Sequence, residues 1–146
     1  MQKIYLSLIL VFLLSFTACS GVSELVKKPQ VKVSSASLKS FSTTDATVNF
    51  SLQLNNPNAF AIKTEGLDYA LNINGIQAAG GKLTNSINLA AGGSQTLELP
   101  VRFSFNNIKN LLPEILSSRR FNYKLAGSIH TRLLNVPFSK SGNLGL

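Results

Sequence analysis

Hydrophobic and polar residues alternate along much of the chain, with the period of two that is typical of a β-strand with one buried face. The alternation is clearest over residues 47–54 and 96–105, and it recurs over residues 67–73. The third run ends in Asn74-Gly75, a pair that favours the type I′ turn of a β-hairpin. Weaker runs lie near residues 31–38, 87–89, 121–129 and 136–138. The pattern therefore predicts about seven strands.

Two departures from strict alternation constrain the fold further. Pro100 cannot donate a hydrogen bond to a ladder, so its strand is expected to lie at a sheet edge or to carry a bulge. One segment has helical spacing instead, with apolar residues at positions i, i+3, i+4, i+7 and i+8 counted from Ile108. Asn106 or Asn107 is available to cap it, and Pro113 predicts either a kink or two short turns, the second beginning at Pro113.

Several strands and a single short helix predict an all-β domain, namely a two-sheet β-sandwich in which the helix covers one end of the core. In our interpretation this domain comprises residues 31–146. Only one face of each alternating run can be buried, so the inward-facing positions follow from the alternation itself. They are Val48, Phe50, Leu52, Leu54, Leu71, Leu99, Val101, Phe103 and Leu125.

Residues 1–18 have the pattern of an export signal peptide. A positively charged start, Met1-Gln2-Lys3, precedes 13 residues of which 11 are apolar, ending at Phe16. This run is too short for a transmembrane anchor, because a helix needs about 20 residues to span a bilayer. The cleavage region Phe16-Thr17-Ala18-Cys19 resembles the bacterial lipoprotein box, although Phe16 stands where Leu is commonest.

The lipoprotein resemblance implies cleavage between Ala18 and Cys19, with diacylglyceryl and acyl chains of the palmitate type attached at Cys19. Several acyl chains, at about 0.8 kcal/mol for each buried CH₂, form a durable membrane anchor. The alternative interpretation of Cys19 is a free thiol that follows an ordinary export signal. By resemblance to Gram-negative sorting rules, Ser20 implies the outer membrane, with the domain facing the periplasm.

Residues 19–30 are interpreted as the lipidated N-terminus and a tether. Ten extended residues reach at most about 33 to 36 Å, so the domain can stand off the bilayer. The Lys27-Lys28 pair adds about 1 kcal/mol per lysine to the attraction for an anionic surface, unless it is simply solvated. The net charge of +8 is scattered, without a basic stripe interleaved with aromatic residues. Anionic lipid headgroups or envelope proteins are therefore the expected partners, and nucleic acid is not.

The composition leaves few options for catalysis or metal binding. One His and one Cys exclude a Cys/His metal cluster and a disulfide framework. His130 has no nucleophile motif nearby and is expected at the surface or on an edge strand, and Glu65 and Asp68 are interpreted as hairpin-flanking charges. Gly80-Gly81-Lys82 and Gly92-Gly93-Ser94 lack phosphate-loop spacing and are predicted to be turns. No catalytic residue, metal ligand or cofactor is predicted.

Three segments carry a family resemblance: LQLNNPNAFAI at residues 52–62, LDYALNING at 67–75 and TLELPVRFSF at 96–105. In this order and spacing they resemble the late embryogenesis abundant (LEA) type 2 family, also called the WHy (water stress and hypersensitive response) domain. The resemblance covers residues 31–146. It implies a fibronectin type III-like or immunoglobulin-like sandwich, no catalytic residues, and a role in desiccation or osmotic stress.

Asn56-Pro57-Asn58 is the family motif within the first of these segments. Pro57 keeps Asn56 extended and Asn side chains bond to nearby backbone, so turn chemistry explains the motif, with a ligand site as the alternative. Two functions remain open. One is a noncatalytic envelope lipoprotein that protects or scaffolds under water stress. The other is a module that binds a lipid, another apolar ligand or a protein partner.

Overall fold

The strands of the computed structural model form where hydrophobic and polar residues alternate, because a pleated strand buries every second side chain. The structure describes residues 26–146. Its strands are β1 (Gln30–Phe41), β2 (Asp45–Asn55), β3 (Ile62–Ile73), β4 (Ile76–Leu83), β5 (Asn88–Leu89), β6 (Ser94–Ser104), β7 (Arg120–Thr131) and β8 (Asn135–Gly145). Two short helices follow β6, the 3-10 helix η2 (Phe105–Ile108) and the α-helix α2 (Leu112–Ser118).

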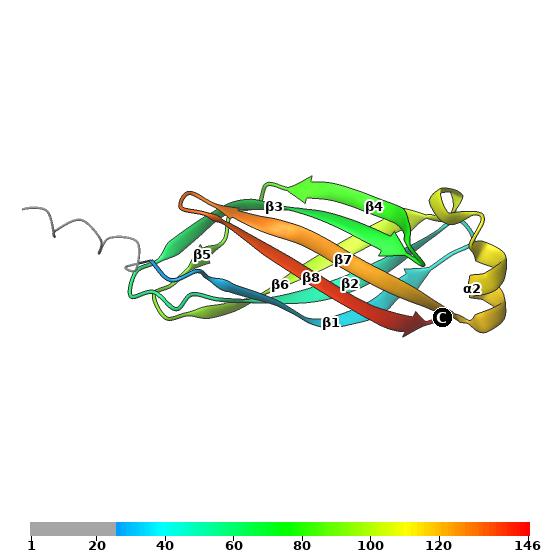
Figure 1. Cartoon of the computed structure of the whole chain (residues 1–146), viewed down its shortest axis with the longest axis horizontal. Helices are drawn as coiled ribbons and strands as arrows, with labels where there is room; N and C mark the ends of the chain where they lie inside the picture. The colour runs from blue at the N-terminus through cyan, green and yellow to red at the C-terminus, as the bar shows by residue number, and fades with distance from the viewer. Residues whose placement is uncertain (1–25) are drawn as a thin grey trace, which may run out of the picture.

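The strands form two antiparallel sheets that face each other (Figure 1). One sheet has the order β1-β2-β6, and the other has the order β4-β3-β7-β8, with β5 also paired to β3. The predicted all-β sandwich with one short α-helix is thereby confirmed. The strand count exceeds the predicted one because β5, a pairing of only two residues, forms a strand of its own.

The space between the sheets is filled by the side chains that the alternation assigns to the buried face. All nine predicted core residues are at most 3% exposed, which confirms the facing of their strands. Phe50 packs edge-on against Tyr123 of the opposite sheet, with ring centroids 5.5 Å apart. Phe103 has Phe105 and Phe121 as aromatic neighbours, at centroid distances of 6.2 and 6.4 Å. These contacts connect the two sheets through the core.

The edge position of β6 agrees with the sequence. This strand pairs with β2 alone, so it lies at the edge of its sheet. Pro100 is opposite Asn49 in an uninterrupted register, which confirms the predicted edge and shows that no bulge forms there. The Asn74-Gly75 hairpin between β3 and β4 is confirmed as well, because φ is 45° and 87° at these residues, in the left-handed region that a type I′ turn requires.

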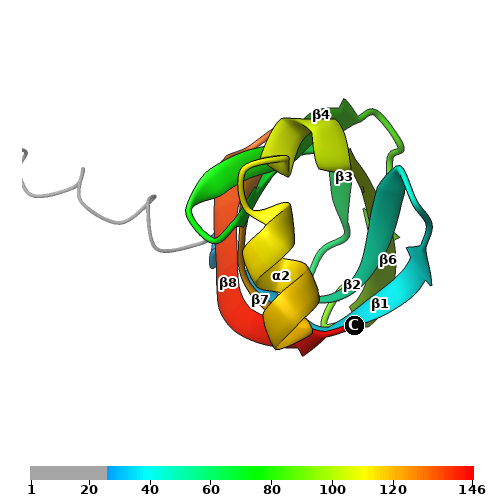
Figure 2. The same ribbon diagram turned by 90° about the vertical axis from the view of Figure 1, so that its right-hand side faces the viewer.

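The helices η2 and α2 cover one end of the sandwich, as the view along its long axis shows (Figure 2). Pro113 lies in the first turn of α2, so the prediction of two short turns is confirmed. The predicted Asn cap is wrong, because the Ser104 hydroxyl accepts a hydrogen bond from the Asn106 N–H and caps η2 instead. Leu116 is 55% exposed, and the buried stripe of the helix therefore ends at Ile115.

One of the two glycine pairs is not a turn, which corrects the sequence prediction. Gly80 and Gly81 lie inside β4, and Gly81 pairs with Tyr69 of β3. A Cβ at Gly81 would lie 3.1 Å from the Tyr69 hydroxyl oxygen, so the glycine leaves room for this ring across the ladder. Gly92, in contrast, has a φ of 63° in the turn between β5 and β6, as predicted.

Candidate functional site

Asn56 and Asn58 build a hydrogen-bond cluster at the end of the sandwich where the described chain begins. Asn56 is 0% exposed, and its Nδ2 donates to the carbonyl oxygens of Phe60 at 2.8 Å, Ala90 at 3.0 Å and Leu89 at 3.3 Å. Its Oδ1 accepts from the backbone N–H of Asn58 at 3.1 Å and from the Asn58 Nδ2 at 3.0 Å. Both ends of the buried amide are therefore used within the protein.

Asn58 extends this cluster to the residues that precede β1. Its Oδ1 accepts from the Lys27 N–H at 2.7 Å, and its Nδ2 donates to the Lys27 carbonyl oxygen at 2.8 Å. The two bonds imitate a strand ladder and fasten the Lys27 backbone to the domain. Pro29 is buried, whereas Lys27 and Lys28 are exposed. Because both Asn side chains bind the chain's own backbone, turn chemistry is the better interpretation of the Asn-Pro-Asn motif.

Replacing Asn58 with alanine is expected to make the Lys27–Lys28 peptide bond several-fold more susceptible to trypsin. A protease needs a locally detached backbone, and the side chain of Asn58 makes both bonds that hold Lys27. The measurement is the rate of cleavage after Lys27, followed by mass spectrometry. Cleavage after Lys109, at the other end of the domain, is the internal control. Equal acceleration at both sites would indicate global unfolding instead of local release.

The other candidate groups lie on the surface around β3 and the β7–β8 turn. His130 Nε2 is 2.9 Å from the Asp68 Oδ1, and His130 Nδ1 is 3.0 Å from the Asn135 Oδ1. His130 is at the surface, as expected, but β7 is an interior strand of its sheet. Arg132 Nε lies 3.5 Å from the Glu65 Oε1. Glu65 and Asp68 thus have separate partners and do not form a joint carboxylate or cation site.

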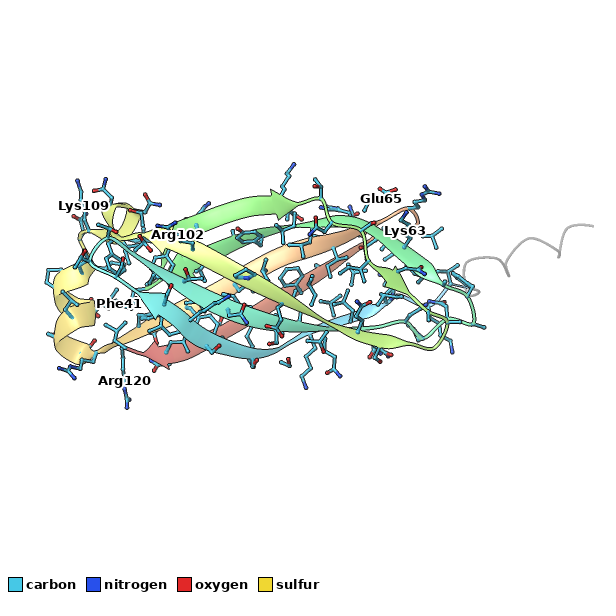
Figure 3. All side chains as sticks on the ribbon, turned by 180° about the vertical axis from the view of Figure 1, so that it is seen from behind. Phe41, Lys63, Glu65, Arg102, Lys109 and Arg120 are labelled. Atoms are coloured by element: carbon cyan, nitrogen blue, oxygen red, sulfur yellow. The ribbon has the colours of Figure 1, made fainter. Side chains whose placement is uncertain are left out.

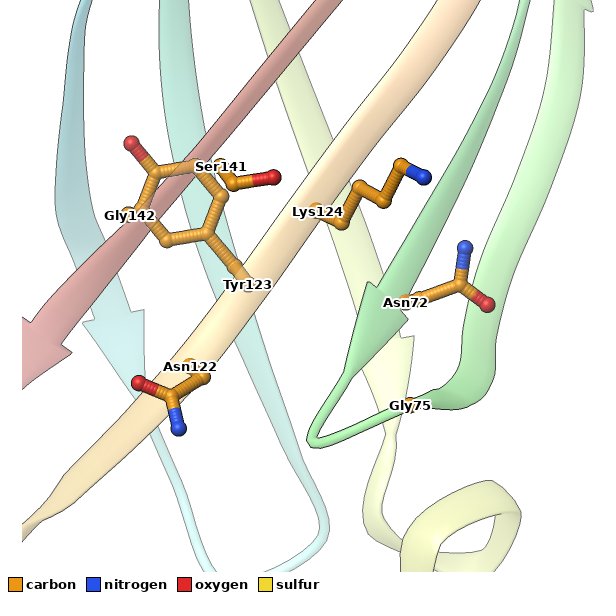
Figure 4. A pocket seen from close by; sticks show the side chains of 7 residues that line it. All are labelled: Asn72, Gly75, Asn122, Tyr123, Lys124, Ser141 and Gly142. Atoms are coloured by element: carbon orange, nitrogen blue, oxygen red, sulfur yellow. The ribbon is translucent and has the colours of Figure 1, made fainter.

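An open pocket of about 790 Å³ lies over β3, β7 and β8 (Figure 4). Its lining consists of Asn72, Gly75, Asn122, Tyr123, Lys124, Ser141 and Gly142. Burial raises the pKa of the Tyr123 hydroxyl, so this phenol loses its proton less readily than an exposed tyrosine. Lys124 is the one charged residue of the lining, which offers polar contacts but no carboxylate or imidazole.

A second pocket, of about 220 Å³, opens at the side of the sandwich between the edge strand β6 and the β4–β5 segment. The apolar part of its lining comprises Leu67, Leu83, Ile87, Leu97, Pro100 and Ile129. The hydroxyl of the buried Thr64 accepts from the Ile87 N–H at 2.8 Å, a role that no motif in the sequence indicates. This volume is below the roughly 300 to 1,000 Å³ of typical small-molecule sites.

Two further properties concern residues 26–146 alone. Within this range, no three His, Cys, Asp or Glu side chains lie close enough together to hold a metal ion. Over the same residues, no helix is long and apolar enough to cross a bilayer. Ala18 and Cys19, the predicted cleavage and lipidation residues, lie outside the described residues, so these assignments stay predictions.

The fold and the site define a class of protein, a β-sandwich module whose buried polar side chains serve its own structure. A solution structure of a protein from Arabidopsis thaliana has a TM-score of 0.70 at 18% identity, covering 89% of this chain and 91% of that one. The solution structure of a late embryogenesis abundant (LEA) protein has a TM-score of 0.64 at 16% identity, covering 99% and 85%. A crystal structure of a protein from Archaeoglobus fulgidus has a TM-score of 0.59 at 11% identity, covering 83% and 97%. These likenesses show a shared fold.

A sequence match makes the assignment more specific. Residues 51–142 match the late embryogenesis abundant protein family LEA_2, and the chain belongs to this family. The matched range contains the Asn-Pro-Asn motif, the whole of β3 to β7 and most of β8, but only the end of β2 and none of β1; the match confirms the predicted LEA type 2 resemblance. No curated protein sequence matches the chain.

Proposed function

We propose that this protein is a noncatalytic, lipid-anchored lipoprotein of the bacterial cell envelope whose LEA type 2 domain protects or scaffolds during desiccation or osmotic stress. The observation that carries the proposal is the position of the LEA domain a short distance after a lipoprotein-type cleavage sequence that ends in Cys19. Assignment to the WHy subgroup, and to the periplasmic face of the outer membrane on the basis of Ser20, belongs to the same proposal.

The partners of the titratable groups support a role without catalysis. The one imidazole of the chain, His130, is bonded to the carboxylate of Asp68 and the amide of Asn135, and within residues 26–146 it has no hydroxyl partner to activate. Asp45 accepts a hydrogen bond from the Arg102 guanidinium at 2.8 Å, which lowers the pKa of that carboxyl. The side chains of both pairs are partly exposed to solvent, as is usual for ion pairs on a protein surface.

The proposed protective mechanism is weak contact at many points. The exposed faces of both sheets carry Ser, Asn, Thr and Lys side chains, whose donors and acceptors can replace the hydration that drying removes from headgroups and neighbouring proteins. Deleting the gene and measuring survival after drying and rehydration tests this role, and reduced survival is expected. Unchanged survival would contradict the protective function.

Replacing Cys19 with alanine is expected to release the protein from membranes. The thiol is the acceptor of the proposed diacylglyceryl group, and without it the anchor cannot form. The measurement is the distribution of the protein between membrane and aqueous fractions, with Ser20→Ala as a matched control that leaves the thiol in place. A Cys19→Ala variant that still fractionates with lipid as fully as the parent would contradict the anchor.

A second candidate function is binding of an apolar ligand, and the lateral pocket beside β6 favours it. The pocket has a largely apolar lining, but its volume of about 220 Å³ is below that of typical small-molecule sites, so the protective role stays the first proposal. Native mass spectrometry of the purified acylated protein distinguishes the two functions. The protective role predicts the mass of the acylated chain alone, whereas a stoichiometric copurifying lipid would favour the binding module.

A further inference from the structure

The end of the domain where the described chain begins exposes large apolar side chains next to basic ones. We name it the tether end and define it by Val26, Phe60, Leu133, Lys27, Lys28, Lys63 and Arg132. Val26 is 36% exposed, Phe60 is 41% exposed and Leu133 is 59% exposed. Single exposed apolar residues are ordinary on protein surfaces. These three are significant only if they lie at the same end of the domain.

The Asn cluster brings two of the apolar residues to the same place. Asn58 holds the backbone of Lys27, and Val26 is the residue before it. Asn56, whose side chain is bonded to Asn58, donates to the carbonyl oxygen of Phe60 at 2.8 Å. Val26 and Phe60 therefore flank one hydrogen-bond network, although 34 positions separate them in the sequence.

Strand register brings the third apolar residue to this end. Thr64, near the start of β3, pairs with Thr131 at the end of β7, so the β7–β8 turn that contains Leu133 lies beside the first residues of β3. Figure 3 shows Lys63 at this end of the molecule and Lys109 at the opposite end, beside the helices. This end of the molecule thus contains the segment before β1, the β2–β3 loop and, set back from the tip, the β7–β8 turn (Figure 1).

The charge of the tether end is positive. Its four basic residues are exposed, and Glu65 pairs with Arg132. In the sequence, Glu24 is the one acidic residue between Cys19 and Lys27. Four basic and two acidic groups leave a net positive charge. Its attraction to anionic headgroups is worth about 1 kcal/mol for each Lys or Arg near such a surface.

The length of the tether selects this end over the opposite one. Eight residue steps separate Cys19 from Lys27, and they span at most about 26 to 29 Å. The twelve residues of β3 alone extend about 36 Å, and α2 lies beyond them. The segment from Cys19 to Lys27 is therefore shorter than the domain. If Cys19 is anchored in a bilayer, the α2 end cannot rest on that bilayer while the tether end points away from it. Leu116, the most exposed apolar residue of α2, is excluded from head-on contact for this reason.

We propose that the tether end rests directly on an anionic lipid bilayer. Phe60 and Leu133 lie in the boundary between headgroups and acyl chains, and the four basic residues lie among the headgroups. The inference rests on the lipid anchor of the proposed function, to which it adds a fixed orientation of the domain. The anchor alone would leave the domain free to stand off the membrane.

An environment-sensitive fluorophore attached at single introduced cysteines tests this orientation in the full, acylated chain. The natural Cys19 is blocked by acylation, so Leu133→Cys and Phe60→Cys are labelled selectively, and Leu116→Cys is the matched control at the α2 end. The labelled proteins are reconstituted into vesicles of phosphatidylethanolamine with phosphatidylglycerol. A blue shift of emission and quenching by spin-labelled lipid are expected at positions 133 and 60 and not at position 116.

The outcomes separate the docking surface from the anchor. Cosedimentation of the chain with vesicles, together with an unshifted probe at position 133, would overturn the docking surface and leave the anchor intact. Failure to cosediment would overturn both. In a second measurement, Lys28→Gln and Lys63→Gln are each expected to lower the ratio of docked to undocked protein about fivefold on the anionic vesicles. Lys109→Gln is the control, and an equal effect of all three variants would also contradict docking by the tether end.

Discussion

Replacing Phe103 with alanine is expected to lower the free energy of unfolding by about 3 to 5 kcal/mol. The side chain is 3% exposed, and its ring lies against Phe105 and Phe121, where β6, η2 and β7 meet. Removing the ring leaves a cavity that the two sheets and the helix cannot close without losing their own contacts. The measurement is equilibrium unfolding in urea, with the midpoint and slope compared between variant and parent.

Phe41→Ala is the matched control for this prediction. Phe41 also contacts Phe105, at a centroid distance of 5.2 Å, but 45% of it is exposed. Its removal is expected to cost clearly less than removal of Phe103, because less apolar surface leaves the core. A loss below about 1 kcal/mol for Phe103→Ala would mean that the ring is not buried and that the register of β6 is different.

Replacing Asn56 with alanine is expected to cost about 3 kcal/mol or more, by a different mechanism. The side chain donates to the carbonyl oxygens of Phe60, Leu89 and Ala90 and accepts from Asn58. Its removal leaves these partners in a buried place without bonds, and each unsatisfied group costs about 1 to 3 kcal/mol. The same urea experiment measures the effect.

Asn143→Ala serves as the control for the Asn56 variant. The Asn143 Nδ2 donates to the Asn122 Oδ1 at 3.0 Å, but this pair is exposed and water can replace the lost bond. A change within about 0.5 kcal/mol is therefore expected for Asn143→Ala. If both variants have similar stability, the buried cluster does not hold the β2–β3 loop against the β5–β6 turn.

The sequence predicts the sandwich well because burial of one strand face is a local signal. Nine inward positions, the edge placement of Pro100 and the helical turn beginning at Pro113 all follow from properties of nearby residues. The prediction fails where the local structure depends on a residue that is distant in the sequence. The Gly80-Gly81 pair is typical of a turn, but both residues lie inside β4, where Gly81 is close to the Tyr69 ring of the neighbouring strand.

The candidate site was predictable only in part for the same reason. The Asn-Pro-Asn motif is visible in the sequence, and its turn chemistry is local. The partners of Asn56 and Asn58 are not visible, since Ala90 lies 34 residues and Lys27 lies 31 residues away along the chain. No pattern in the sequence marks a backbone group as the partner of a particular side chain. The contact between Asn58 and the chain before β1 could be predicted only with knowledge of the strand topology.

The bonds between Asn58 and Lys27 lie at the point where tension on the N-terminal chain enters the domain. From there β1 runs along β2, with pairs from Gln30 opposite Asn55 to Phe41 opposite Ala46. The hydrogen bonds of an antiparallel ladder are perpendicular to its strands, so a pull along β1 loads them in shear. Many bonds then share the force and do not open one after another. A pull on the chain that precedes β1 therefore loads the sandwich in the direction in which the β1–β2 ladder resists most.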